Sequence, residues 1–196
     1  MSRIIRADLA TDTALLIPTY VNATSQDLYD IFNNGPIVLV KSMIAERLSS
    51  HGIDLSTKPV PIGSYSSVII ASNFAYVSGQ IATDPNKQPA EVKFKGKVGK
   101  DVSINEAKKA AELCVINGLS QLNAALGDLE RVKKFVKLSG YINCEPTFVD
   151  HAMVINGASD FVVRIFEDRG KHARIAVGVN SLPLNSCVEI DLIVEI

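Results

Sequence analysis

The sequence has almost no excess of charge of either sign. Its 196 residues include 20 Lys and Arg side chains and 21 Asp and Glu side chains, giving a formal net charge of -1 at pH 7. Proteins that bind duplex nucleic acid usually carry a basic excess on the binding surface. We therefore do not expect nucleic acid to be the main partner of this protein.

Long apolar runs are also absent. No stretch approaches the ~18 consecutive apolar residues of a membrane span, and Asp8 and Asp12 interrupt the N-terminal apolar run, so it does not resemble the core of a signal peptide. The three cysteines, Cys114, Cys144 and Cys187, are far apart and lack metal-ligand spacing. Such cysteines fit reduced thiols used for packing. These absences predict a cytoplasmic protein without a membrane partner.

Familiar catalytic motifs are missing as well. The chain has three histidines and contains no P-loop, no G-x-G-x-x-G, no Ser/His/Asp spacing and no metal-ligand cluster. Residues 96–100, GKVGK, lack the Walker spacing and its Ser or Thr, so we interpret them as a solvated basic loop. His151 and His172 each lie near a predicted helix end or strand start, which favours a hydrogen-bonded or solvated role over catalysis.

The hydrophobic content of 47% is enough for a substantial core in one domain, or in one domain with an appendage. Residues 1–42 form the appendage in this interpretation. They can supply a short helix over 25–35 and a short strand over 36–41, which is too little to fold alone. We predict an N-terminal extension over 1–42 and a domain over 43–196 that begins with a helix at Met43.

The first half of the domain shows a hairpin and a long helix. Residues 61–85, PIGSYSSVIIASNFAYVSGQIATDP, contain two short apolar runs around a turn at Ser72-Asn73. Further on, Ser103 and Glu106 form an S-x-x-E capping box and Gly127 supplies a stop. Small residues recur between them at steps of three and four, which predicts a long helix lying flat on a sheet.

The second half alternates strands and helices. Residues 131–144 read as a half-buried strand with Val132, Val136, Leu138 and Ile142 on one side, and residues 147–168 read as a second helix. Two further strands, over 173–179 and 187–195, are joined by a turn at Pro183. This order predicts an α+β fold with a mixed sheet and both helices on one face. The other sheet face would then require a partner subunit, so we expect an oligomer.

Two charged residues stand inside the last two apolar strands. Arg174 lies in HARIAVGV and Glu189 in CVEIDLIVE, where a buried charge is costly unless it is paired or used. On these residues alone, the interpretation that both face solvent or pair with each other is favoured over a functional role. If the strands form a hairpin centred on Pro183, the two residues are about 10 Å apart, a gap that could hold a small substrate.

Taken together, three segments and one order of elements resemble the Rid family of reactive intermediate deaminases, also called YjgF or, in older usage, endoribonuclease L-PSP. They are PIGSYS, YVSGQIATDP, HARIAVGVNSLPLNSCVEIDLIVEI and the helix-strand-helix order between them. The resemblance covers residue 60 to the C-terminus and is to a divergent branch of the family. It implies a chorismate-mutase-like fold, a homotrimer whose sheets form an inner barrel, and clefts between subunits.

The resemblance also implies an activity and a site. Family members hydrolyse enamines and imines such as 2-aminoacrylate to a 2-keto acid and ammonia, without a metal or organic cofactor. The family's carboxylate-binding arginine falls on Arg174 and its water-activating glutamate on Glu189. Tyr65, Gly79 and Asn156 match further pocket residues, so the small and polar residues of the hairpin are expected to line the cleft.

The sequence departs from the archetype at several positions. Ser64 stands where the archetype has Pro, Ala176 where it has Cys, and residues 91–101 are longer and more basic than usual. These differences leave two alternatives to the hydrolase. One is a trimeric module that binds a small carboxylate without turnover, and the other is a ribonuclease or translation inhibitor, which the balanced charge disfavours.

Overall fold

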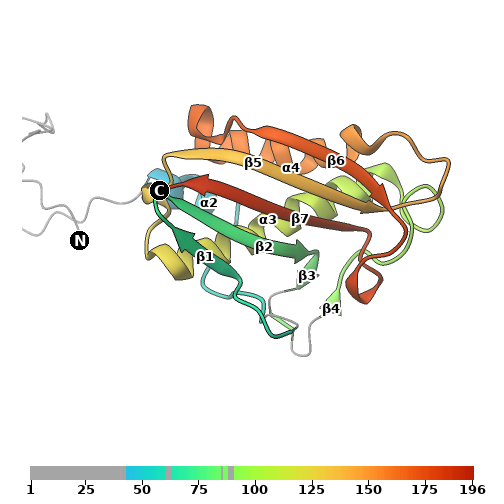
Figure 1. Ribbon diagram of the computed structural model, residues 1–196, viewed down its shortest axis with the longest axis horizontal. Helices are drawn as coiled ribbons and strands as arrows, with labels where there is room; N and C mark the ends of the chain where they lie inside the picture. Colours follow the sequence, from blue (N-terminus) through green and yellow to red (C-terminus); the bar gives the residue numbers. More distant parts are fainter. Residues whose placement is uncertain (1–42, 61–62, 85, 88–90) are drawn as a thin grey trace, which may run out of the picture. The chain divides into compact units, whose positions relative to one another are not determined.

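The computed structural model describes residues 43–60, 63–84, 86–87 and 91–196 (Figure 1). The predicted N-terminal extension, with its helix over 25–35 and strand over 36–41, lies outside the described residues. The helices and strands are α2 (Met43–Ser50), β1 (Val68–Ala71), β2 (Phe74–Ile81), β3 (Thr83–Asp84), β4 (Glu91–Val92), α3 (Ile104–Leu126), β5 (Lys134–Asn143), α4 (His151–Phe166), β6 (Ala173–Val179) and β7 (Val188–Glu195). Three 3-10 turns, η1 (Leu129–Arg131), η2 (Glu167–Gly170) and η3 (Pro183–Asn185), join some of them.

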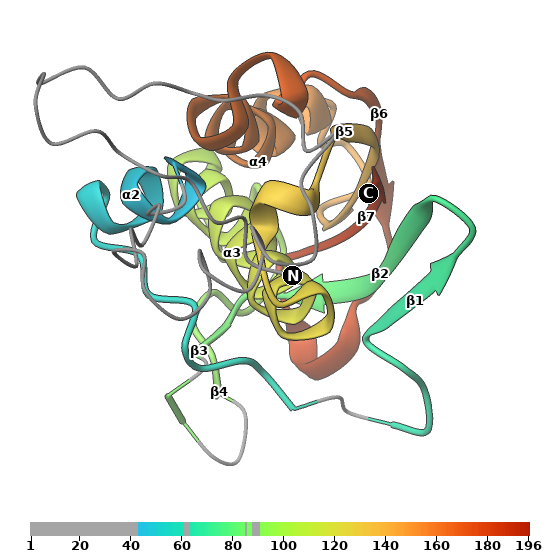
Figure 2. The ribbon, with the colours of Figure 1, turned by 90° about the vertical axis from the view of Figure 1, so that its left-hand side faces the viewer.

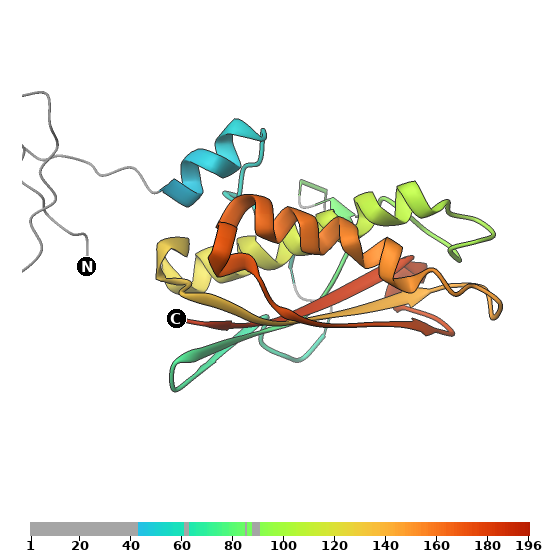
Figure 3. The ribbon, with the colours of Figure 1, turned by 90° about the horizontal axis from the view of Figure 1, so that it is seen from above.

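A five-stranded mixed sheet forms the centre of the fold, in the order β1-β2-β7-β5-β6. β5 and β6 are parallel, and the other neighbours are antiparallel. The helices α3 and α4 both cover one face of this sheet, as Figure 3 shows from the side, and Figure 2 shows α2 on the same helical side. The predicted α+β fold with a mixed sheet and two helices on one face is therefore confirmed.

The predicted hairpin of the last two strands is wrong. β7 lies between β2 and β5, and β6 pairs with the far side of β5. A β-α-β crossover through α4 makes β6 parallel to β5, which places it at the edge of the sheet. The connection after β6 contains η3 and is long enough for the chain to pass the end of β5. Arg174 and Glu189 consequently do not lie on neighbouring strands.

The long helix α3 begins and ends as its sequence predicts. Ser103 and Glu106 make the reciprocal capping box, and Gly127 closes the helix in the left-handed conformation at φ 77°. The hairpin turn at Ser72-Asn73 also forms between β1 and β2. The second helix differs from its prediction, because α4 begins at His151 rather than at residue 147 and gives way to the 3-10 turn η2 after Phe166.

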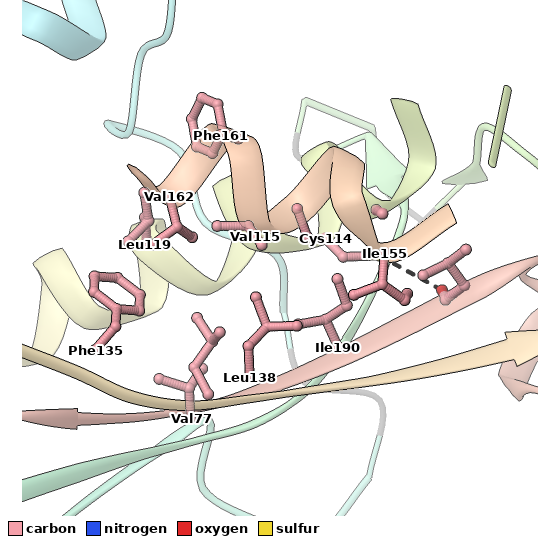
Figure 4. Packing of buried hydrophobic residues seen from close by; sticks show 14 of the residues in the cluster. Val77, Cys114, Val115, Leu119, Phe135, Leu138, Ile155, Phe161, Val162 and Ile190 are labelled. Carbon is pink, nitrogen blue, oxygen red and sulfur yellow. Dashed lines mark hydrogen bonds between the residues drawn. The ribbon is translucent and has the colours of Figure 1, made fainter. Parts of the chain in front are cut away.

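The core lies between the sheet and the two helices (Figure 4). Leu138, Ile155 and Ile190 meet there, and Leu119 and Phe135 lie toward the C-terminal end of α3. All three cysteines are buried and free, which confirms their packing role. Burial raises the pKa of the Cys187 thiol to about 12, so this thiol is not an activated nucleophile.

A β-bulge in β5 changes which of its residues face the core, compared with the prediction. The register between β5 and β7 shifts between Phe135 and Lys137. The extra residue turns Val136 outwards, where it is 37% exposed, and turns Phe135 into the core. Simple alternation along residues 131–144 could not show this shift, because a bulge inverts the sides of the strand residues before it, here Lys134 and Phe135.

The loop at residues 96–100 is also more structured than predicted. The Lys97 ammonium donates hydrogen bonds to Asn143 Oδ1 at 3.1 Å, to the Cys144 carbonyl at 3.2 Å and to the Asn180 carbonyl at 2.8 Å. Asn143 is the last residue of β5, and Cys144 and Asn180 directly follow β5 and β6, so Lys97 holds the ends of the two strands together. The interpretation of this segment as a solvated basic loop is wrong for Lys97.

The face of the sheet opposite the helices, called here the open face, carries exposed apolar side chains. The cross-strand register places Ile69, Tyr76 and Ile193 in one row and Ile175 in another. Ile69 is 54% exposed, and Tyr76 and Ile175 are each 44% exposed. An exposed face of this apolar composition is typical of a protein interface.

Among the described residues, no helix is long and apolar enough to cross a membrane.

Candidate functional site

Arg174 is the second residue of the edge strand β6. Its register partner is the buried Leu138 of β5, so its side chain emerges on the helical side of the sheet beside α4. There Nη1 donates hydrogen bonds to Asn156 Oδ1 at 2.8 Å and to Ser159 Oγ at 3.1 Å. Asn156 and Ser159 are three residues apart on α4 and therefore share one face of that helix. We call Arg174, Asn156 and Ser159 the arginine half-site.

The charge of Arg174 has no carboxylate beside it in the part of the chain that the structure describes. None of the ion pairs recorded there includes Arg174. Both of its hydrogen bonds to other side chains start from Nη1, which leaves the edge formed by Nε and Nη2 available. That edge presents two parallel N–H donors, the geometry that grips a carboxylate with two hydrogen bonds.

Glu189 is the second residue of β7 and faces the open side of the sheet. Its neighbours Val188 and Ile190 are fully buried on the helical side, while Glu189 is half-buried. Its cross-strand partners are Tyr141 on β5 and Ile81 on β2. Burial and, secondly, the nearby Asp191 charge raise the pKa of the Glu189 carboxyl above its ordinary value of 4.5. A raised pKa favours a group that takes up and returns a proton near neutral pH.

Gly79 makes room for the Glu189 carboxylate. The register of β2 against β7 shifts between Val77 and Gln80, so Gly79 lies in a β-bulge. A Cβ atom at position 79 would overlap Glu189 Oε1 and come within 2.9 Å of Glu189 Cδ. The family resemblance implies that Gly79 lines the pocket, and the overlap with Glu189 explains why this position has no side chain.

Tyr141 and Asp191 belong to the same region and were missed from the sequence. The Tyr141 hydroxyl donates a hydrogen bond of 3.0 Å to Asp191 Oδ2. Burial, and secondly this contact with Asp191, raise the pKa of Tyr141, so the hydroxyl stays a donor. The available signal was the E-x-D spacing in VEID, which puts two carboxylates on one strand face. We call Glu189, Gly79, Tyr141 and Asp191 the glutamate half-site.

Tyr65 lies in the segment before β1 and is 49% exposed. The residues after it run along the β2 bulge, because Ser78 donates its backbone N–H to the Ser67 carbonyl at 2.9 Å and its hydroxyl to the Ser66 carbonyl at 2.8 Å. Ser78 directly precedes Gly79. The segment that carries Tyr65 is thereby held near the glutamate half-site, with the tyrosine side chain accessible.

The two half-sites lie on opposite faces of the sheet of one chain. In the register of the sheet, Arg174 of β6 is aligned with Leu138 of β5 and Leu192 of β7. Glu189 lies on β7, two strands away from β6, and three residues before Leu192. Strand spacings of about 4.8 Å and a rise of about 3.3 Å per residue separate the two Cα atoms by about 14 Å. A small molecule cannot contact both half-sites of one chain, since the sheet itself stands between them.

The described residues contain few other groups that could bind a metal or act as a nucleophile. No group of three or more His, Cys, Asp or Glu side chains within them could hold a metal ion. Cys144 Sγ lies 3.6 Å from His151 Nε2, but burial raises the pKa of that thiol and so disfavours the thiolate. His172 Nε2 is hydrogen-bonded to Ser159 Oγ, which agrees with the predicted hydrogen-bonded role of this histidine.

These features define an α+β protein with a helix-backed mixed sheet and, at the edge of that sheet, an arginine without an ion-pair partner among the described residues. The chain belongs to the YjgF/Rid family. The family model described as "YjgF/chorismate_mutase-like, putative endoribonuclease" matches residues 45–196. Protein TCP17 of Trypanosoma cruzi is 38% identical over 160 residues, which cover 81% of this chain and 98% of that protein.

Solved structures support the same assignment. The Agrobacterium tumefaciens protein Atu1372, whose function is described as unknown, is 41% identical with a TM-score of 0.70, and the match covers 79% of this chain and 94% of that one. RidA from the Antarctic bacterium Psychrobacter sp. PAMC 21119 is 25% identical with a TM-score of 0.50, and the match covers 74% and 98%. The predicted family and its chorismate-mutase-like fold are confirmed.

Proposed function

We propose that this protein is a cofactor-free cytoplasmic hydrolase of small enamine and imine carboxylates such as 2-aminoacrylate. The observation that carries the proposal is Arg174. Its guanidinium is exposed at the sheet edge, is held at Nη1 by two side chains of α4, and has no ion-pair partner among the described residues. A small anion with a planar carboxylate matches the remaining donor edge.

The two half-sites can divide the chemistry between them. Arg174 binds the substrate carboxylate and thereby orients the C=N bond. Glu189 accepts a proton from a water molecule as the water oxygen attacks the imine carbon, and the resulting carbinolamine keeps the former imine nitrogen. Glu189 returns this proton to the nitrogen, then takes up the proton of the carbinolamine hydroxyl and delivers it to the nitrogen as the C–N bond breaks and the C=O bond forms. One imine and one water give one 2-keto acid and one ammonia, so atoms and electrons balance.

This chemistry needs two chains, because one chain cannot bring its half-sites together. We infer that the arginine half-site of one subunit faces the glutamate half-site of the next in a homotrimer. The exposed apolar side chains of the open face, Ile69, Tyr76 and Ile175, support burial of that face by another copy. Closure of three subunits into a ring would then form three equivalent sites, each lined by two chains.

The two alternatives receive less support. A binding module would need Arg174 but not the raised pKa of Glu189, and it would bind a keto acid without accelerating hydrolysis. A ribonuclease would bring phosphates to the open face, where β7 presents Glu189, Asp191 and Glu195. Lys137 of β5 lies opposite Ile193 on the same face, so this face has no basic excess that would attract a polyanion.

The proposal is tested by measuring keto-acid release from 2-aminoacrylate generated in the assay. Wild-type protein should accelerate the reaction, and Arg174→Ala should raise KM about 10- to 100-fold, because it removes charge-assisted hydrogen bonds to the substrate. Arg164→Ala is the matched control, since Arg164 lies on α4 and pairs with Glu112 instead. No acceleration by a folded wild-type oligomer that still binds pyruvate would point to the binding module.

The rate should also depend on pH through Glu189. The carboxyl accepts a proton only when ionised, so kcat/KM should rise with pH through a pKa above 4.5. Asp191→Asn removes the neighbouring negative charge and should shift this acid limb to lower pH, although burial will still keep it raised. Tyr141→Phe keeps the Asp191 charge and should leave the limb high. Profiles of kcat/KM between about pH 4 and about pH 8 measure the shift, and an unmoved limb in Asp191→Asn would contradict this role.

A further inference from the structure

His172 stands two residues before Arg174, between η2 and β6, and forms a hydrogen-bonded chain to it. Its Nδ1 lies 2.6 Å from the Gly170 carbonyl oxygen, and its Nε2 lies 3.0 Å from Ser159 Oγ. Ser159 Oγ is in turn 3.1 Å from Arg174 Nη1. The chain therefore runs from the backbone at Gly170, through the imidazole and the serine hydroxyl, to the guanidinium.

The direction of each hydrogen bond follows from the first. A carbonyl oxygen can only accept, so His172 Nδ1 carries a proton, and in the neutral ring Nε2 is then the acceptor. The Ser159 hydroxyl donates to Nε2. Its oxygen keeps lone pairs that face Arg174, and Nη1 donates to them. In this arrangement the imidazole orients the serine hydroxyl, and every donor in the chain has an acceptor.

We propose that His172 is a positioning residue for Arg174, which acts through Ser159. A long, exposed arginine side chain has many rotamers, and holding Nη1 on both Asn156 and Ser159 restricts them before the ligand arrives. The Nε and Nη2 edge then points toward the ligand without a further ordering step. This inference rests on the proposed function, since it assumes that Arg174 binds the substrate carboxylate.

The consequence is an effect on binding rather than on chemistry. Without an acceptor at the Nε2 position, the Ser159 proton can turn toward Arg174, and its oxygen is then lost as an acceptor for Nη1. Asn156 alone would hold the guanidinium. We expect weaker binding of carboxylates and an unchanged kcat, because Glu189 lies on the other half-site and is untouched.

The test uses pyruvate, a stable 2-keto acid, and measures its Kd for the full-length protein by calorimetry or ligand-observed NMR. His172→Asn can keep the donor to Gly170 but has no group at the Nε2 position. We expect it to raise Kd about tenfold, the effect of losing one hydrogen bond. His172→Gln places an amide oxygen near the Nε2 position and should recover most of the loss. His151→Asn, at the start of α4, is the matched control and should leave Kd unchanged.

A second arm separates this inference from the proposed function. In an Arg174→Ala background, His172→Asn should cause no further loss, because its effect passes through the arginine. An equal tenfold loss with and without Arg174 would overturn the positioning role, as would identical losses in His172→Asn and His172→Gln. If Arg174→Ala itself binds pyruvate as tightly as wild type, the proposed function fails, whatever the histidine variants do.

Discussion

Glu189→Gln is expected to lower kcat by about 10²- to 10⁴-fold, the range of a lost general base. Glutamine has nearly the same shape as glutamate, so it should fit the space above Gly79 without disturbing the β2 bulge. In the proposed function, Arg174 binds the substrate carboxylate on the other half-site. The Kd for pyruvate should therefore stay close to that of wild type, and the loss should fall on kcat rather than on KM.

A control for this prediction lies on the same strand and the same face. Glu195 is the last residue of β7, six residues after Glu189, and its cross-strand partners are Phe74 and Lys134. Glu195→Gln removes an equal charge from the open face outside the glutamate half-site. It should retain wild-type kcat. If Glu189→Gln also keeps a kcat within about threefold of wild type, general-base catalysis by Glu189 is wrong.

Much of the fold could be predicted from local sequence. Ser103, Glu106 and Gly127 specify both ends of α3, because capping depends on a few neighbouring residues. The hairpin turn at Ser72-Asn73 is equally local. Strand order is not local, and the insertion of β7 between β2 and β5 depends on long-range pairing that no nearby residue specifies.

In the candidate site, too, local features could be predicted from the sequence and long-range pairing could not. Arg174 and Glu189 were recognisable as charges in apolar strands, and Asn156 proves to be a direct partner of Arg174. Their spacing could not be predicted, because the assumed hairpin placed them near one another across a single pair of strands. The bulge at Gly79 and the pairing of Tyr141 with Asp191 depend on cross-strand register, which a one-residue shift inverts.

The division of the site between two faces of the sheet leads to a prediction about mixed oligomers. Arg174→Ala and Glu189→Gln homotrimers should each be nearly inactive when assayed well below the wild-type KM. In trimers assembled from equal amounts of both variants, a site is intact when the Glu189→Gln chain supplies Arg174 and the Arg174→Ala chain supplies Glu189. Random assembly meets this condition at about a quarter of the sites.

A second mixture independently distinguishes a site shared between two chains from a site held within one chain. Wild-type chains mixed equally with chains that carry both substitutions should retain about a quarter of the wild-type activity if each site joins two chains, and about half if each chain holds its own site. Both mixtures require chains that exchange, so the variants are co-expressed or refolded together. Size-exclusion chromatography with light scattering then checks that the mixed assemblies are trimeric.

The most direct test of the account is the activity of the equal mixture of Arg174→Ala and Glu189→Gln chains. Recovery to about a quarter of the wild-type kcat/KM, from two nearly inactive parents, is the predicted result. It would show in one measurement that both residues are required and that they act from different subunits. An active wild-type protein whose variant mixture shows no recovery above the parents would contradict the intersubunit site.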